Sequence, residues 1–297
     1  FAPSPTGYLH VGGLRTALYN FFFAKKLHGE LILRIEDTDQ NRLVQDAEKN
    51  LIKTLTWSGI QFDEGPHIDG MFGPYRQSER LSIYTKFYRE LISSKQAYPC
   101  FYSKERLQNL EDGVLSSEDA TIEDTVFKNF DYEEALLRME KESFVVRLII
   151  PNNKNLIHKD LIKGDVTFDL SLINDPIIIK SDGFPTYHFA NVIDDHLMNI
   201  THVIRGEEWL PSIPKHLVLY QALNWPPPQF AHLPLLLNFD KTKLSKRKND
   251  VSVENYIEKG YLRAGLVNFL SLLGWHEKGD REIYNIEELI KAFSLDR

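Results

Sequence analysis

The N-terminal part of the chain alternates between short apolar runs and helical patterns, and this order limits the folds open to it. Phe1 to Pro5 closes a short strand, and apolar residues then recur at helical spacing from Leu14 to Phe22. The run from Leu31 to Ile35 is typical of a buried strand, and a second helical pattern extends from about Val44 to Trp57. An order of strand, helix, strand and helix predicts an α/β fold with a parallel sheet covered by helices.

Length and composition fit about two globular domains. The chain has 297 residues, of which 42% are hydrophobic and 26% are charged. Its apolar runs are too short to span a bilayer, so we expect no membrane contact. Cys100 is the single cysteine, which excludes an intrachain disulfide and a cysteine-based zinc site. We therefore expect a cytoplasmic protein without zinc.

The α/β pattern is interrupted and later resumes, which predicts an inserted domain. Residues 103–142 hold 12 acidic and 5 basic side chains, and strand-like runs of an α+β unit follow them. Helix and strand patterns then alternate again as far as an expected strand over 233–237. We expect the first half of a Rossmann-type domain over 1–95, the insertion over 96–182, the second half over 183–240, and a basic loop with a helical region over 241–297.

A histidine and two glycines mark the start of the first helix. His10, Gly12 and Gly13 lie between the first strand and this helix. Glycines allow a ligand to approach the backbone, and a helix N-terminus favours phosphate. The histidine can donate a hydrogen bond to a phosphoryl oxygen as negative charge develops on it. Alone, the same pattern also fits a tight turn with a surface histidine.

A second candidate phosphate site follows the last expected strand. Lys241 to Lys248 carries five cations and no anion in a chain whose formal net charge is −7. From charge alone, a solvated loop explains this run equally well. Because a parallel sheet gathers the carboxyl ends of its strands at one edge, this loop and His10 can meet over one ligand.

Several ordered motifs resemble those of one family. His10 to Gly13 matches the HIGH signature of class I aminoacyl-tRNA synthetases, and Lys243 to Arg247 matches their KMSKS signature. The chain is most similar to bacterial-type glutamyl-tRNA synthetases, and this similarity covers essentially its whole length. The further motifs that carry it are Ala2 to Gly7, Arg34 to Asp39, Gly73 to Arg80, Asp182 to Asn191 and Val203 to Trp209.

This resemblance implies a reaction in two steps. L-glutamate and ATP, which brings Mg²⁺ on its phosphates, form glutamyl-adenylate, and the acyl group then passes to the 3′ end of tRNA(Glu). The carboxylate of the amino acid is itself the nucleophile, so catalysis consists of positioning and charge stabilisation. We expect His10, Lys243 and Lys246 to provide that stabilisation. The implied ATP-binding residues are His10, Gly12, Gly13, Glu208, Trp209, Leu236, Lys243, Ser245 and Lys246.

Without the motif, three of these residues have simpler explanations. Glu208 fits an exposed carboxylate, Trp209 a core indole and Leu236 a core aliphatic side chain. Their assignment to adenosine contacts therefore depends on the resemblance.

Glutamate recognition requires a group that binds a second carboxylate. A guanidinium does so with two parallel charge-assisted bonds, and Arg205 is the candidate. Tyr187 and Asn191 are four residues apart on an expected helix and therefore share a face. By resemblance, they line the same pocket, while Ser4 and Glu36 hold the α-amino group of glutamate and Ala2 also contacts the amino acid.

An acidic motif follows the expected buried strand, and its residue types resemble part of a metal site. Asp37 and Asp39 form an Asp-x-Asp pattern, but no further ligands are spaced around them. We therefore expect Thr38 and Asp39 to cap the next helix, and we predict no metal ligands in the protein.

Three other functions remain open on the sequence. A glutamyl-queuosine tRNA(Asp) synthetase suits the length, although the intact Lys-Leu-Ser-Lys-Arg motif and the missing zinc cysteines argue against it. A nucleotidylyltransferase that makes a dinucleotide cofactor also uses a His-x-Gly-His helix start, but it needs neither the long insertion nor Arg205. A non-catalytic tRNA-binding module has no need of His10 and Lys246.

The ends of the sequence suggest a fragment of a longer protein. The chain begins at Phe1 without methionine, and a helical pattern runs into Arg297 without a stop signal. By resemblance, an arginine precedes Phe1 and an anticodon-binding domain follows Arg297. We further expect the 96–182 insertion to bind the tRNA acceptor end, the helical region to contact the tRNA stem, and the protein to be a monomer.

Overall fold

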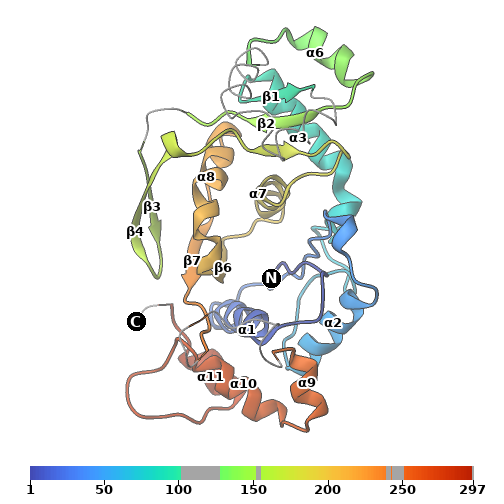
Figure 1. Cartoon of the computed structure of the whole chain (residues 1–297). Coiled ribbons are helices and arrows are strands. Elements are labelled where there is room, and N and C mark those ends of the chain that lie inside the picture. Colours follow the sequence, from blue (N-terminus) through green and yellow to red (C-terminus); the bar gives the residue numbers. More distant parts are fainter. Residues whose placement is uncertain (102–127, 152–154, 239–241, 243–250, 296–297) are drawn as a thin grey trace.

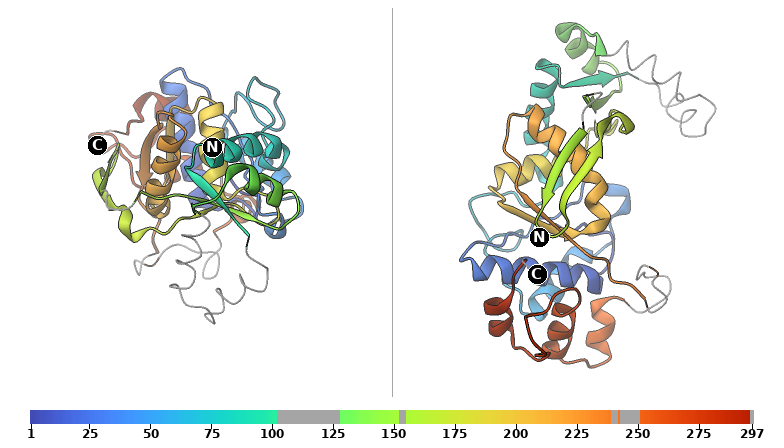
Figure 2. Two further views of the ribbon diagram at one scale, coloured as in Figure 1. Left: turned by 90° about the horizontal axis from the view of Figure 1, so that it is seen from above. Right: turned by 90° about the vertical axis from the view of Figure 1, so that its left-hand side faces the viewer.

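The computed structural model describes residues 1–101, 128–151, 155–238, 242 and 251–295. The helices and strands are α1 (Val11–Lys26), α2 (Ala47–Trp57), α3 (Leu81–Ser93), β1 (Ala97–Cys100), α6 (Tyr132–Met139), β2 (Val145–Leu148), β3 (Asn155–Asp160), β4 (Gly164–Asp169), β5 (Ile177–Ile179), α7 (Tyr187–Leu197), β6 (His202–Gly206), α8 (Ile213–Ala222), β7 (Gln229–Leu233), α9 (Val253–Glu258), α10 (Arg263–Ser271) and α11 (Ile286–Ala292). The molecule is elongated, with α6 and β1 at one end and α9 to α11 at the other (Figures 1 and 2). Within these residues, none of the helices is both long and apolar enough to cross a membrane.

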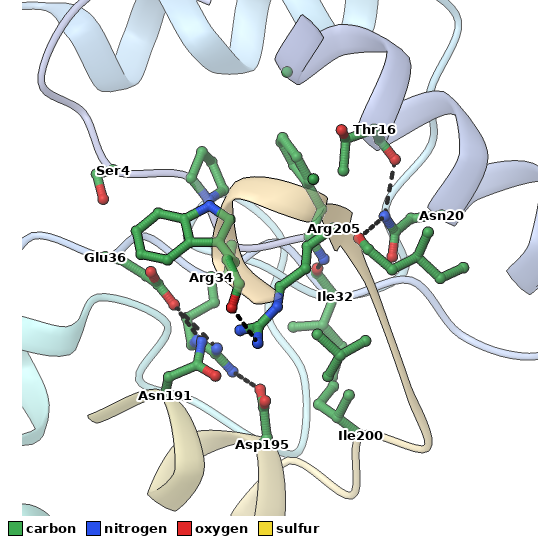
Figure 3. Close-up of a pocket in the computed structure, with 18 of the residues that line it drawn as sticks. Ser4, Thr16, Asn20, Ile32, Arg34, Glu36, Asn191, Asp195, Ile200 and Arg205 are labelled. Atoms are coloured by element: carbon green, nitrogen blue, oxygen red, sulfur yellow. Dashed lines mark hydrogen bonds and ion pairs between the residues drawn. The ribbon is translucent and has the colours of Figure 1, made fainter. Parts of the chain in front are cut away.

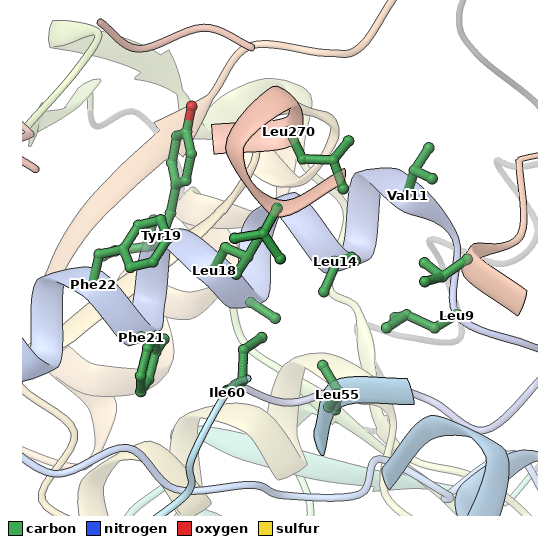
Figure 4. Packing of buried hydrophobic residues seen from close by; sticks show 14 of the residues in the cluster. Leu9, Val11, Leu14, Leu18, Tyr19, Phe21, Phe22, Leu55, Ile60 and Leu270 are labelled. Atoms are coloured by element: carbon green, nitrogen blue, oxygen red, sulfur yellow. The ribbon is translucent and has the colours of Figure 1, made fainter. Parts of the chain in front are cut away.

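Helix α1 lies at the centre of the first hydrophobic core (Figure 4). Its apolar face, which includes Leu14, Leu18 and Phe22, is completely buried. Helices α10 and α11 pack against α1, and residues of α2 and of the extended segment 31–35 complete the cluster. Burying each such side chain stabilises the folded state by about 1.5–3 kcal/mol. The helical spacing of apolar residues in the sequence correctly predicts this buried face.

The second core lies between an antiparallel sheet and three helices. The sheet has the strand order β1-β2-β5, and α3, α7 and α8 supply the apolar side chains that pack with it. Tyr84 of α3 and Phe189 of α7 are both fully buried, with ring centroids 6.4 Å apart. This core holds α7 in place, and α7 carries Tyr187 and Asn191.

Strands β6 and β7 form a parallel pair whose register places Arg205 opposite His232. The strand expected over 233–237 is wrong in position, because the observed strand ends at Leu233. Backbone pairing with β6 decides this end, and Leu237, beyond it, is more than half exposed. The adjacent β3-β4 hairpin is antiparallel and contacts β7.

The segment 31–35 is extended and buried, as expected of a strand, but it forms only isolated bridges. Ile32 bridges Glu64 and Ile35 bridges Arg76, both in parallel orientation. The segment therefore runs through the first core and leads directly to Glu36.

The helix caps expected from Thr38 and Asp39 are wrong. Asp39 precedes a single 3₁₀ turn, and its side chain makes no cap hydrogen bond. Helix α2 begins later, after Asp46, whose side chain also makes no cap hydrogen bond. The contact that orders this motif is tertiary, because the Asp37 carboxylate accepts hydrogen bonds from the backbone N–H and hydroxyl of Ser78 at 2.8 and 2.6 Å.

The buried carboxylate of Asp194, on α7, accepts hydrogen bonds from three side chains around the start of α3. It accepts from Arg80 Nε at 2.7 Å, Gln77 Nε2 at 2.9 Å and the Tyr84 hydroxyl at 2.8 Å. The Arg80 and Asp194 side chains are 2% and 0% exposed. A buried charge requires its partner, so this contact ties α3 to α7.

We predict that Asp194→Asn lowers the free energy of unfolding by about 3–5 kcal/mol, because it leaves Arg80 buried without its counter-charge. Urea unfolding followed by circular dichroism measures the change. Asp46→Asn is the control, since Asp46 pairs with Lys49 on the surface and its loss costs at most about 1 kcal/mol. Equal effects of the two substitutions would contradict the prediction.

Candidate functional site

One pocket gathers most of the residues predicted to bind substrate. Its volume of about 350 Å³ is typical of a small-molecule site. It lies between the segment preceding α1, the start of α1, helix α7 and the end of β6 (Figure 3). The predicted residues in its lining are Ala2, Ser4, Gly12, Gly13, Glu36, Tyr187, Asn191, Arg205, Glu208 and Trp209.

The remaining predicted residues are placed differently. Among the described residues, His10 and Leu236 do not belong to this lining, although His10 directly precedes α1. Leu236 is half-buried in the segment after β7. Lys243, Ser245 and Lys246 lie outside the described residues, so their place at the site stays a prediction.

His10 caps the N-terminus of α1 with its side chain. Its Nδ1 accepts a hydrogen bond from the backbone N–H of Gly12 at 2.9 Å. An imidazole nitrogen that accepts carries no proton, so the ring proton is on Nε2. Gly12 and Gly13 line the pocket at the same helix start. This wall therefore combines a glycine backbone with the positive dipole end of α1, and the His10 imidazole lies directly beside it, which suits a phosphate.

Glu36 and Asn191 meet at one end of the pocket. The Glu36 Oε1 atom accepts from Arg34 Nη2 at 3.1 Å and from Asn191 Nδ2 at 2.9 Å. Since a carboxylate only accepts, these contacts orient the Asn191 amide. Within the described part of the chain, its buried Oδ1 has no hydrogen-bond partner. A ligand that donates hydrogen bonds fits beside this oxygen.

Arg34 holds this end of the pocket together. Its Nη1 donates to Asp195 at 2.8 Å, so one guanidinium bridges Glu36 and Asp195 (Figure 3). Burial raises the pKa of both carboxyls, and the charge of Arg34 opposes this rise. Burial acts against the charge on Arg34, but the surrounding carboxylates raise its pKa well above the usual range.

Arg205 enters the pocket from the end of β6. Its Nη1 donates to the Tyr187 hydroxyl at 3.1 Å, and its Nη2 donates to the Trp209 carbonyl at 3.3 Å. The rings of Tyr187 and Trp209 lie with their centroids 4.5 Å apart. Burial raises the pKa of the Tyr187 phenol, which therefore stays neutral. The guanidinium is thus held at the pocket wall from two sides.

Glu208 lies close to the end of β6. Its carboxylate occupies the space beside Gly206 that the side chain of any other residue at position 206 would fill. Trp209 is 40% exposed, so the alternative of a core indole does not hold.

Two pocket residues on α1 were not assigned from the sequence. Asn20 Nδ2 donates to the carbonyl oxygens of Thr16 at 2.8 Å and Ile204 at 2.9 Å. Asn20 thereby joins α1 to β6, beside Arg205. The four-residue spacing of Thr16 and Asn20 on the glycine-led helix is the signal that points to a shared face.

Arg34 and Asp195 are two further polar lining residues that the sequence analysis missed. Arg34 lies two residues before Glu36 in an extended segment, and Asp195 lies four residues after Asn191 on α7. Both spacings place side chains on one face, so each residue could have been found from its assigned neighbour.

Two histidines pack against Tyr187: His188, which is half-buried, and His216, which is fully buried. His188 Nδ1 and His216 Nε2 are 3.1 Å apart, and the two ring centroids are 5.2 Å apart. Burial, followed by the charges of Lys215 and Arg205, lowers the pKa of His188 to about 4. Burial also lowers the pKa of His216 well below its usual value. Both imidazoles are therefore neutral in the folded protein at neutral pH.

A comparison with protein-family models identifies the family of the chain. The model for "tRNA synthetases class I (E and Q), catalytic domain" matches residues 1–297. The chain belongs to this family. The resemblance that the motifs indicate is therefore confirmed at the level of the class I synthetase family.

Relatives of this class I synthetase chain are similar to it throughout. The glutamate–tRNA ligases of Chlorobium phaeobacteroides and Chlorobaculum parvum are 53% and 52% identical to it, and each match covers 100% of the chain and 61% of the relative. The chain thus spans about three fifths of the length of these relatives.

A solved structure shows the same α/β fold. The crystal structure of a glutamate–tRNA ligase from Elizabethkingia meningosepticum in complex with its amino acid superposes with a TM-score of 0.88 at 40% identity. The match covers 99% of this synthetase chain and 64% of that chain. The expected α/β class is therefore confirmed.

We predict that the synthetase chain loses stability between pH 7 and pH 5. The pKa of His188 falls from 6.5 to about 4 on folding, so the unfolded state binds more protons in this window. Stability therefore decreases as the pH falls, by on the order of 1–2 kcal/mol for this histidine.

Urea unfolding at pH 7 and pH 5 measures this loss, and His188→Gln is expected to reduce it. His276→Gln is the control, because His276 is exposed and folding changes its surroundings little. An identical pH dependence in the parent protein and in His188→Gln would refute the prediction.

Proposed function

We propose that the chain is the catalytic part of a glutamate–tRNA ligase. It activates L-glutamate with ATP to form glutamyl-adenylate and pyrophosphate, and it transfers glutamate to the 3′ end of tRNA(Glu). The relatives named as glutamate–tRNA ligases support this reaction. The pocket supports it independently, because its polar groups suit an amino acid with a second carboxylate.

The guanidinium of Arg205 is the observation that carries the proposal. A guanidinium has five N–H groups, and His232, Tyr187 and the Trp209 carbonyl each take one. Among contacts with the described residues, two N–H groups of Arg205 have no partner, one on each terminal nitrogen. A carboxylate matches such a pair with two charge-assisted bonds, whereas a carboxamide offers only one acceptor oxygen.

The α-amino group of glutamate fits the opposite end of the pocket. Glu36 supplies negative charge there, and the Asn191 Oδ1 atom supplies an acceptor without a protein partner among the described residues. Ala2 and Ser4 line the wall beside them. An ammonium group therefore finds a counter-charge and an acceptor, while Arg205 binds the side-chain carboxylate.

ATP binds, in this proposal, at the start of α1. The phosphates approach Gly12 and Gly13, and the Nε2 proton of His10 is donated to a phosphoryl oxygen. The glutamate carboxylate attacks the α-phosphorus, and the bond to the leaving pyrophosphate breaks. Lys243 and Lys246 stabilise the developing negative charge. Magnesium enters with the ATP phosphates as part of the substrate, and we assign no zinc to the protein.

The adenosine side of the ATP site remains an assignment by resemblance. It comprises Glu208, Trp209, Leu236 and Ser245. Glu208 and Trp209 support it because both line the pocket beside Arg205. Leu236 lies in the segment that leads from β7 toward the KMSKS motif.

We assign the parts of the chain to the boundaries inferred from the sequence. Residues 1–95 and 183–240 form the Rossmann-type catalytic domain, 96–182 the acceptor-binding insertion, and 241–297 the KMSKS loop with the start of the stem-contact region. The sheet β1-β2-β5 supports the insertion, since all three strands fall within 96–182. We further propose a cytoplasmic monomer.

We predict that the protein attaches glutamate to tRNA(Glu) in the presence of MgATP. The expected product is a base-labile ester at the 3′ end, because the activated carboxylate is transferred to a ribose hydroxyl. Charging of separated tRNA(Glu), tRNA(Gln) and tRNA(Asp) with labelled glutamate measures this activity. Label on tRNA(Asp) alone would instead identify the glutamyl-queuosine activity, and glutamate-independent pyrophosphate exchange a nucleotidylyltransferase.

We predict that Arg205→Gln lowers kcat/KM for glutamate at least about 100-fold, because two charged hydrogen bonds to the substrate are lost. Arg205→Lys is expected to fall nearly as far, since an ammonium cannot provide the planar pair of donors. Glutamate-dependent ATP–pyrophosphate exchange with tRNA(Glu) present measures both. Arg281→Gln, which removes an exposed arginine paired with Glu288, is the control and is expected to leave exchange unchanged. Unaltered glutamate kinetics in Arg205→Gln would rule out this role.

A further inference from the structure

A line of buried side chains extends from Arg205 away from the pocket. Arg205 Nε donates to His232 Nε2 at 3.1 Å, and His232 Nδ1 lies 2.6 Å from Asp160 Oδ2. The side chains of His232 and Asp160 are both 0% exposed. We name these three residues the Asp160–His232–Arg205 array. Neither His232 nor Asp160 lines the pocket, so neither can touch the substrate directly.

Two separate structural elements bring the array together. The parallel register of β6 and β7 places Arg205 opposite His232. Asp160 is the last residue of β3, and its hairpin is held against the sheet by a hydrogen bond from Leu161 N to Phe230 O at 2.9 Å. The orientation of Arg205 therefore depends on a hairpin that contributes no residue to the pocket lining.

The partners of His232 determine which ring nitrogen carries the proton. Arg205 Nε–H can only donate, so Nε2 of the imidazole must accept. The proton of the neutral ring is therefore on Nδ1, from where it is donated to Asp160. Burial lowers the pKa of His232 and favours this neutral form. A proton on Nε2 would instead point the imidazole N–H group at the Nε–H group of Arg205.

The array determines how Arg205 can bind a carboxylate. A guanidinium binds a carboxylate by donating two hydrogen bonds, either from Nε and one terminal nitrogen or from both terminal nitrogens. His232 occupies Nε, so only the pair of terminal nitrogens remains for the ligand. The array therefore restricts the guanidinium to one binding direction, facing the pocket.

The two oxygens of Asp160 have different tasks. Oδ1 accepts from the backbone N–H groups of Ile162 and Lys163, both at 2.9 Å, and thereby holds the hairpin turn; it also accepts from the backbone N–H of His232 at 3.3 Å. Oδ2 accepts from His232, and His158 Nε2 lies 3.8 Å from it. Burial raises the pKa of Asp160, but the nearby imidazole of His158 and the hydrogen bonds from His232 and from the turn lower it well below the usual range. A single substitution can therefore change the contact with His232 while keeping the turn.

We propose that Asp160 and His232 are positioning residues for glutamate recognition: they hold Arg205 by its Nε and direct its two terminal N–H groups at the side-chain carboxylate of the substrate. This inference rests on the proposed role of Arg205. It assigns part of the glutamate specificity to a hairpin outside the pocket. It also requires the Nδ1-protonated tautomer of His232.

Asp160→Asn tests the proposal directly. The carboxamide oxygen can still accept from the turn, but its NH₂ group faces His232 Nδ1. The imidazole must then carry its proton on Nε2, which opposes the Nε–H group of Arg205. We expect the KM for glutamate to rise roughly 10- to 100-fold in ATP–pyrophosphate exchange with tRNA(Glu) present, because a charged hydrogen bond is lost. The KM for ATP is expected to stay unchanged.

Ring ¹⁵N chemical shifts of His232 provide a second readout that does not depend on catalysis. We expect the proton on Nδ1 in the parent chain and on Nε2 in Asp160→Asn. Asp169→Asn is the matched control, because Asp169 lies on the same hairpin and its carboxylate caps Ser171 at the surface. This control is expected to change neither the glutamate KM nor the His232 tautomer.

A pair of substitutions at His232 separates positioning from stability. His232→Gln keeps an acceptor oxygen for Arg205 but loses the contact with Asp160, so we expect a lower thermal midpoint and a smaller rise in the glutamate KM than His232→Leu produces. His232→Leu removes the acceptor and is expected to raise the glutamate KM as Asp160→Asn does.

The possible outcomes distinguish this inference from the proposed function. If the parent protein shows no glutamate-dependent exchange, the proposed function fails, and the inference fails with it. If exchange in the parent is normal and Asp160→Asn keeps the parent KM for glutamate, only the inference is overturned. A parallel rise of both KM values with a lower thermal midpoint would also overturn it, because that result indicates a purely structural role.

Discussion

The site depends on a group of buried charges between the extended segment 31–36 and α7. Arg34 pairs with Glu36 and Asp195, while the neighbouring Asp194 pairs with Arg80. Buried charges require close partners of opposite sign, so these ion pairs fix the position of the segment 31–36 relative to α7. Glu36 and Asn191 face the pocket because their neighbours hold the backbone on both sides.

The opposite end of the pocket depends on strand pairing. The β6-β7 register places Arg205 and His232 side by side, and the β3-β4 hairpin adds Asp160 behind them. Each residue satisfies a donor or acceptor of the next, and an unsatisfied group in this buried position would be costly. The orientation of Arg205 is thereby linked to a hairpin that lies far from Arg205 along the chain.

Much of the fold could be predicted from sequence, and the errors have physical causes. Helical periodicity correctly located α1 and its buried face, because the spacing of apolar side chains reflects the burial of one stripe. The end of β7 was misplaced by several residues, since leucines continue beyond Leu233 and only pairing with β6 decides where the strand ends. Thr38 and Asp39 matched a capping pattern, but the competing contact of Asp37 with Ser78 is tertiary.

The sequence by itself determined the α/β class, the family and ten of the residues that line the pocket. The class follows from the local periodicity of apolar residues. The family and most of the assigned pocket residues follow from the resemblance of the motifs to those of class I synthetases. The tertiary structure alone decided the direction of the Arg205 guanidinium, the tautomer of His232 and the part played by Asp160. Such properties depend on hydrogen bonds between β3, β6 and β7, and the distance between these segments in sequence conceals those contacts.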